Sequence, residues 1–326
     1  MKKPFILALA ALLVVGAVLG VLELYHGHLD EPMTVTVPEG AGLSAIAESL
    51  EGAVYPTAFR LYVIVKGEAA HLRPGTYLVE KGMGYAEILE MLKAGVPDEV
   101  AHFTVPEGYE LREIRALLDE KGILFAAEFD AAVLDFDAGA YPFLKDIGKG
   151  TNRLEGFLFP DTYEVFVGES GDSILRRMVD RFAQVWTADF AARAKALDMT
   201  PYEVVTLASI IEREAAKASE QAHVSSVFHN RLKSSRYPYL ESCATVQYIL
   251  KERKPVLSFA DTEIVSPYNT YKNPGLPVGP IAAPGEGAIR AALYPDDHDD
   301  YFFFAQPDGT HIFSKTFAEH LRAQGR

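Results

Sequence analysis

The chain has 326 residues, of which 49% are hydrophobic, and its formal net charge is −14 at pH 7. This length and apolar content indicate a globular protein with room for two domains. The negative charge and the absence of a Lys/Arg cluster exclude nucleic acid as a partner, because phosphate binding requires clustered cations. Cys243 is the only cysteine, so an intramolecular disulfide is excluded and stability must come from packing.

Residues 5–22 form an unbroken apolar stretch that follows Lys2 and Lys3 and precedes Glu23. Such a stretch is long enough to span a bilayer, and its positive flank should stay in the cytoplasm. We therefore expect residues 1–30 to be a cytoplasmic tip and transmembrane anchor that holds the rest of the chain outside the cytoplasm, at the cytoplasmic (inner) membrane. The alternative is a cleaved signal peptide, but residues 16–20 offer only a poor cleavage site.

A short motif occurs twice, as VTVPEG at residues 35–40 and as FTVPEG at 103–108. Each copy predicts a strand, a turn and an amphipathic helix, the helices covering residues 43–50 and 111–118. After the first copy come an apolar run at 59–65, a turn and strand at 71–79, and a helix at 85–92 closed by Gly95 as C-cap. Residues 31–100 are thus predicted to be a compact strand, helix, helix, strand module.

Residues 126–150 have a helical pattern followed by a loop in which Gly148 and Gly150 mark a flexible join. We expect residues 101–153 to be a second strand and helix unit with a linker, and residues 154–326 to be the main domain. Its predicted helices span 173–196, 201–217, 219–233, 245–250 and 288–293. Predicted strands near 301–305 and 311–313 flank a Pro-Asp-Gly turn, so the sequence predicts an α+β fold with a mostly helical second domain and a β-hairpin.

One carboxylate stands out in the helix predicted at 201–217. Glu214 shares a helical stripe with Leu207, Ile210 and Ile211, whereas Glu212 points away from it. A carboxyl group in apolar surroundings keeps its proton near neutral pH and can donate it to a leaving group. The alternative is a boundary glutamate that reaches water or pairs with Lys217. The pattern predicts an ordinary solvated acid at Glu212.

Polar and aromatic residues gather at 266–271, in the order SPYNTY, ahead of the Gly- and Pro-rich segment 275–281. Such loops suit sugars, whose C–H faces stack on rings and whose hydroxyls need fixed hydrogen bonds. A structural loop whose Asn and Thr bond to their own backbone is an equally good interpretation. Our candidate substrate-binding residues are Glu155, Asn230, Thr245, Tyr268, Asn269, Thr270 and Tyr271.

Residues 296–300 (DDHDD), with His311, Glu319 and His320, contain metal-ligand types, but their spacing fits neither HExxH nor an EF-hand. We interpret the acidic run as a surface turn and expect no metal and no cofactor. Ser209 lies in no GxSxG motif, and the chain has no phosphate-binding glycine loop.

Several motifs together resemble the membrane-anchored endolytic murein transglycosylases of the YceG-like family: LEGFLFPDTY at 154–163, LASIIEREA at 207–215, VFHNRL at 227–232, SPYNTY at 266–271 and GLPVGPI at 275–281. Residues 31–100 resemble LysM domains, which bind cell-wall glycans. The resemblance implies a lysozyme-like catalytic domain and places the essential acid and base on Glu214. It implies peptidoglycan strands and the membrane as partners, with peptidoglycan synthases as candidate protein partners.

The chain departs from that family at residues 242–248, SCATVQY, where members carry Ser-Asp-Pro-Thr-Val-x-Tyr. Cys243 replaces the usual Asp and Ala244 the usual Pro. If that Asp binds substrate or orients Glu214, this chain has lost or replaced the contact.

The reaction that the resemblance implies cleaves the β-1,4 bond between N-acetylmuramic acid and N-acetylglucosamine and forms a 1,6-anhydro end. Because the muramic C6 hydroxyl takes the place of water, one carboxylate suffices, whereas ordinary glycosidases use two. The alternatives are a hydrolytic muramidase and an inactive cell-wall-binding scaffold.

Overall fold

The computed structural model describes residues 29, 32–95 and 100–325. The predicted anchor at residues 5–22 lies outside these ranges. Within them, no helix is both long and apolar enough to cross a membrane. The chain divides into two units: residues 1–100 with 166–168, and residues 101–165 with 169–326.

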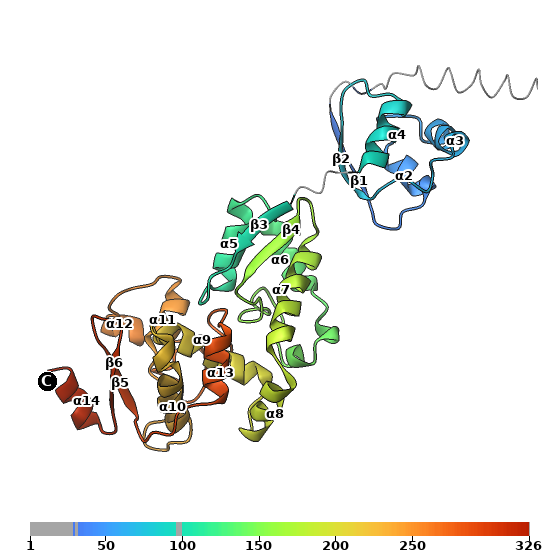
Figure 1. Cartoon of the computed structure of the whole chain (residues 1–326). Helices are drawn as coiled ribbons and strands as arrows, with labels where there is room; N and C mark the ends of the chain where they lie inside the picture. Colours follow the sequence, from blue (N-terminus) through green and yellow to red (C-terminus); the bar gives the residue numbers. More distant parts are fainter. Residues whose placement is uncertain (1–28, 30–31, 96–99, 326) are drawn as a thin grey trace, which may run out of the picture. The chain divides into compact units, whose positions relative to one another are not determined.

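The first unit pairs two antiparallel strands and packs three helices on them (Figure 1). Val35 lies opposite Tyr77 in this sheet, and both side chains enter a core with Phe59 and Tyr62. The elements follow one another as strand, helix, helix, strand and helix, so a third helix follows the predicted four-element module, and Gly95 closes that helix with a φ of 78°. The elements are β1 (Met33–Val37), α2 (Leu43–Ser49), α3 (Pro56–Lys66), β2 (Gly75–Val79) and α4 (Tyr85–Ala94).

The second unit is mostly helical, as predicted, and contains two small two-stranded sheets. Strand β3 pairs with β4, and β5 pairs antiparallel with β6 to form the predicted hairpin beside α14 (Figure 1). Its strands are β3 (Val100–Thr104), β4 (Thr162–Phe166), β5 (Phe302–Ala305) and β6 (His311–Ser314). Its helices are α5 (Leu111–Glu120), α6 (Ala126–Asp135), α7 (Gly171–Val185), α8 (Ala188–Ala196), α9 (Pro201–Glu214), α10 (Gln221–Leu232), α11 (Cys243–Leu250), α12 (Phe259–Thr262), α13 (Glu286–Leu293) and α14 (Phe317–Ala323). Short 3-10 turns occupy Ala138–Ala140, Pro142–Leu144 and Ala218–Glu220.

Residues 101–153 share one hydrophobic core with the residues that follow, which differs from the predicted separate unit and linker. Phe103 stacks on Tyr163 with ring centroids 5.3 Å apart, and Phe143 lies 4.9 Å from Phe182. Strand β3 pairs with β4 some sixty residues away, a contact that the local pattern could not reveal. The second copy of the repeated motif is therefore part of the main domain.

Two predicted helix boundaries differ from the structure. The helix predicted at 173–196 is two helices, because the Thr187 hydroxyl accepts the Phe190 N–H and starts α8 anew. The helix predicted to reach residue 217 ends at Glu214, and Ala215 has extended backbone angles. Glu214 is therefore the last residue of α9.

Candidate active site

Helix α9 is fixed at its start by a capping box in which Thr200 and Glu203 satisfy each other's backbone N–H groups. Pro201 occupies the first turn, where its missing N–H costs nothing. From Val204 to Ile211 every residue is buried, and α13 and α10 pack against the helix. The apolar stripe inferred from the sequence is thus part of a helix that is buried on all sides, which makes α9 a rigid support for Glu214.

The two glutamates differ in their partners rather than in exposure, since both are half-buried. Glu212 is not the solvated acid that the pattern predicted. Its Oε2 accepts the Gly285 N–H at 3.0 Å, and burial raises its pKa, an effect that this hydrogen bond opposes. Glu212 therefore holds the start of α13 against α9.

The Glu214 carboxyl meets two polar donors, not the purely apolar surroundings that the sequence suggested. Ser242 Oγ donates to Oε1 at 2.5 Å, and the Ala244 N–H donates to the same oxygen at 3.2 Å. Among the described residues no donor reaches Oε2. When this carboxyl is a neutral acid, two donors on Oε1 place its proton on Oε2, the oxygen left open for another molecule.

Ser242 precedes α11 as its N-cap residue, yet its side chain does not cap that helix. Its hydroxyl is used by Glu214 instead, while its N–H donates to Thr270 Oγ1 at 3.0 Å. Thr245 Oγ1 lies 2.9 Å from Thr270 Oγ1 and donates to the Ser242 carbonyl at 2.8 Å. Thr245 and Thr270 are both buried, so they hold Ser242 from behind.

The loop at 266–271 is held by Asn269, which is fully buried. Its amide donates to the carbonyls of Thr262 and Ile264 at 2.9 and 2.7 Å, and its Oδ1 accepts the Tyr271 N–H at 2.9 Å. With those bonds made, Asn269 shapes the loop, as the structural interpretation of this segment expected.

Two tyrosines of the same loop remain partly exposed. The Tyr271 hydroxyl lies 3.2 Å from Cys243 Sγ, and the Tyr268 ring lies 4.9 Å from that of Tyr248. Burial raises the pKa of the Tyr271 hydroxyl, and the neighbouring Cys243 adds to this effect. Of the residues predicted in this loop, the tyrosines are the ones that can meet a ligand.

Glu155 is buried beside a cavity of about 210 Å³. Its Oε1 accepts the Leu111 N–H at 2.9 Å, and the Tyr248 hydroxyl donates to its Oε2 at 3.0 Å. Burial raises the pKa of Glu155 to about 8. The walls of the cavity include Asn152, Tyr248 and Tyr268.

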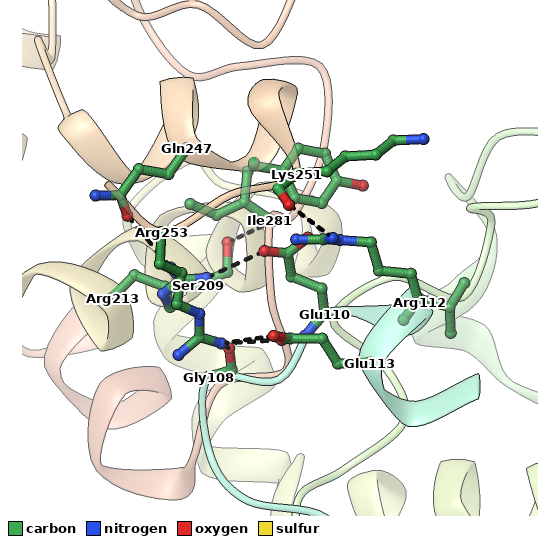
Figure 2. Close-up of polar contacts among 12 residues, drawn as sticks. Gly108, Glu110, Arg112, Glu113, Ser209, Arg213, Gln247, Lys251, Arg253 and Ile281 are labelled. Atoms are coloured by element: carbon green, nitrogen blue, oxygen red, sulfur yellow. Dashed lines mark hydrogen bonds and ion pairs between the residues drawn. The ribbon is translucent and has the colours of Figure 1, made fainter. Parts of the chain in front are cut away.

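Charged residues form a cluster at the start of α5, between that helix and α11 (Figure 2). The Glu110 carboxylate is buried, with Arg112 Nε at 2.6 Å and Arg213 Nη1 at 3.4 Å. Arg112 also donates to the Lys251 carbonyl at 3.0 Å, and Arg213 donates to Gln247 Oε1 at 3.4 Å. The cluster ties the residue next to Glu214 to both α5 and α11, a connection that the sequence did not reveal.

Asn230 lies in a different part of the unit, where its amide donates to the carbonyls of His298 and Asp300 at 2.8 and 2.9 Å. His223, Asp296 and His298 offer potential metal ligands within 4.8 Å of one another. The two imidazole rings are stacked, with centroids 3.9 Å apart and planes 8° from parallel. Because a lone pair lies in its ring plane, stacked rings do not converge on one ion, so we assign these residues to packing of the acidic loop on α10.

Several known proteins are similar to this chain. The YceG-like family model matches residues 35–326. A Bacillus subtilis protein named endolytic murein transglycosylase is 33% identical, over 94% of this chain and 90% of its own length. A Streptococcus pneumoniae protein of the same name is 32% identical, over 89% of this chain and 57% of its own length. A crystal structure of a yceG-like protein from Listeria monocytogenes matches with a TM-score of 0.62 and 31% identity, covering 90% of this chain and 99% of that one.

Proposed function

Since the chain belongs to the YceG-like family, we propose that it is an endolytic murein transglycosylase with Glu214 as its catalytic residue. The proposed substrate is the glycan strand of peptidoglycan. The proposed reaction cleaves the bond between N-acetylmuramic acid and N-acetylglucosamine within the strand and leaves a 1,6-anhydro-muramic end. Its biological effect would be to terminate a growing strand.

The observation that carries the proposal is the arrangement of the Glu214 carboxyl. Oε1 is held by Ser242 and by the Ala244 N–H, and Oε2 has no donor among the residues that the structure describes. A general acid must reach the leaving oxygen with a proton in a fixed direction. The two bonds to Oε1 supply that direction.

The chemistry needs one carboxyl group in two successive roles. Glu214 first donates its Oε2 proton to the glycosidic oxygen while the bond from that oxygen to C1 breaks, and positive charge develops at C1 and the ring oxygen. The resulting carboxylate then takes the proton of the muramic C6 hydroxyl, while the oxygen of that hydroxyl forms a bond to C1. No water is consumed, and Glu214 ends protonated for the next cycle.

The remaining predicted site residues divide into two groups under this proposal. Tyr268 and Tyr271 are partly exposed and supply rings and hydroxyls that suit a sugar. Thr245, Asn269 and Thr270 are buried and bonded to protein, so they support the site from behind. Asn230 and Glu155 also act through protein contacts.

A murein substrate requires the second unit to lie outside the cytoplasm, which agrees with the expected single-pass anchor at residues 5–22. Residues 31–100 are proposed to bind cell-wall glycans in the manner of LysM domains; two helices between two paired strands support this proposal. Peptidoglycan synthases are proposed as partners because a strand can be terminated only where strands are being made.

Product analysis of peptidoglycan digested with the purified full-length chain tests the proposal. We expect anhydro-muramic ends from the wild type, none from Glu214→Gln, and continued cleavage by the matched control Glu212→Gln. Reducing ends in place of anhydro ends would identify a hydrolytic muramidase. No cleavage by the wild type would favour the inactive scaffold, for which Cys243 is the candidate lesion.

A further inference from the structure

We propose that Glu155, acting through Tyr248, is a positioning residue that fixes helix α11 so that Ser242 and Ala244 meet the Glu214 carboxyl. This inference rests on the proposed function, because it concerns the same acid. Glu155 does not touch Glu214. Its effect passes through one short helix.

Helix α11 connects the two sites directly. Ser242 and Ala244 lie at its start and donate to Glu214 Oε1, while Tyr248 lies one turn further on and donates to Glu155. A helix of eight residues is about 12 Å long and moves as a rigid body, so a shift at Tyr248 is transmitted to Ala244. The bond from Ser242 to Glu214, at 2.5 Å, leaves little room for such a shift.

Glu155 itself is anchored to the start of α5. Its Oε1 accepts the N–H of Leu111, the first residue of α5, and Asn152 Nδ2 donates to the Tyr248 hydroxyl at 3.1 Å. Arg112, one residue further along α5, holds the Lys251 carbonyl at the end of α11. Tyr248 and Lys251, in the last turn of α11 and just after it, are therefore both attached to the start of α5. Helix α5 is the helix of the second repeated motif.

The charge state of Glu155 changes the energy of this attachment, because burial opposes a carboxylate there while the Leu111 N–H and the Tyr248 hydroxyl favour it. A neutral carboxylic acid shares a hydrogen bond with Tyr248 without placing a charge in the core, whereas a carboxylate there is disfavoured by burial and by Glu110 and Glu113. With its pKa raised to about 8, Glu155 is neutral at pH 7 and becomes charged above pH 8. The titratable and charged groups around it are Glu110, Arg112 and Glu113 on the α5 side, Tyr248 and Lys251 on the α11 side, Tyr202 on α9, and Tyr268.

The test compares variants of the full-length chain by the initial rate at which anhydro ends form on soluble glycan strands. Glu155→Gln keeps a neutral group of the same shape, so we expect most of the wild-type kcat at pH 7. Above pH 8 the ratio of its kcat to that of the wild type should rise, because only the wild type gains a buried charge.

Two further variants separate positioning from folding. Glu155→Ala and Tyr248→Phe should each lower kcat about tenfold to a hundredfold with KM little changed, as expected for a misplaced catalytic group. Thermal unfolding must show that each variant is folded at the assay temperature. Glu164→Gln, on an exposed position of β4, is the control and should behave as the wild type.

The outcomes distinguish this inference from the proposed function. If the wild type forms anhydro ends but the kcat ratio for Glu155→Gln is the same at pH 7 and pH 9, the positioning role is refuted. The same conclusion follows if folded Tyr248→Phe retains the wild-type kcat. If the wild type forms no anhydro ends at all, the proposed function itself fails.

Discussion

Replacing Glu155 by Gln should make the second unit more stable at alkaline pH than the wild type. In the folded chain the pKa of Glu155 is about 8, and an ordinary glutamate titrates at 4.5. Between these values the folded state binds one proton more than the unfolded state, so the wild-type unfolding free energy falls as the pH rises from 4.5 to 8. Glutamine does not titrate and lacks this loss.

The size of this change in unfolding free energy follows from the two pKa values of Glu155. The difference between a pKa of 4.5 in the unfolded chain and about 8 in the folded chain corresponds to about 5 kcal/mol of unfolding free energy. The wild type loses this full amount above pH 8 and none of it below pH 4.5. The variant should therefore match the wild type near pH 4.5 and exceed it progressively above that pH. Water that enters the cavity beside Glu155 and hydrates the wild-type carboxylate would reduce the stability advantage of the variant.

Urea unfolding at several pH values measures this difference. Trp186 is the only tryptophan and stacks on Phe182 in the core of the second unit, so its fluorescence reports that unit. The exposed Glu164→Gln serves as the control. A difference between variant and wild type that is the same at pH 5 and pH 9 would show that Glu155 is not a buried neutral acid.

Three other substitutions test single contacts. Ser242→Ala should lower kcat about tenfold to a hundredfold without unfolding the chain, because Glu214 Oε1 loses its 2.5 Å hydrogen bond; activity assays at constant folded fraction check this. Glu110→Gln should lower the unfolding free energy by about 3 kcal/mol, since it leaves a buried arginine without its carboxylate; an unchanged urea midpoint would contradict this. Gly156→Ala should cost about 3 kcal/mol, because φ is +82° and the new Cβ would lie 2.6 Å from Pro280 Cβ; calorimetry measures the loss.

The sequence was sufficient for features that depend on local pattern. The strands and helices of residues 33–94, the hairpin near the C-terminus and the start of α9 follow from periodicity, caps and turn residues. Even the break between α7 and α8 carries a visible signal, since Thr187 is a good N-cap residue.

The pattern around Glu214 predicts the helix but not its surroundings. It treated α9 as amphipathic, but the helix is buried on every side, and only tertiary contacts distinguish Glu212 from Glu214. Ser242, the group that holds Glu214, is 28 residues away in sequence. A serine ahead of a helix predicts an N-cap, and nothing local shows that its hydroxyl is used elsewhere.

The candidate sugar-binding residues show the same limit. Asn269 and Thr270 were chosen for side chains that can bond a sugar, yet both are buried and bonded to protein. Glu155 lies in a shared motif, but its burial depends on Leu111 and Tyr248, which approach from distant parts of the chain. Residue type indicates what a side chain can do, and the fold decides what it meets.

We propose that Glu214 is the single acid and base of a transglycosylase. Mass spectrometry of purified peptidoglycan digested by the wild type, Glu214→Gln and Glu212→Gln tests it most directly. We expect anhydro-muramic ends from the wild type and from Glu212→Gln, and none from a folded Glu214→Gln. Anhydro ends produced by Glu214→Gln at the wild-type rate would contradict it.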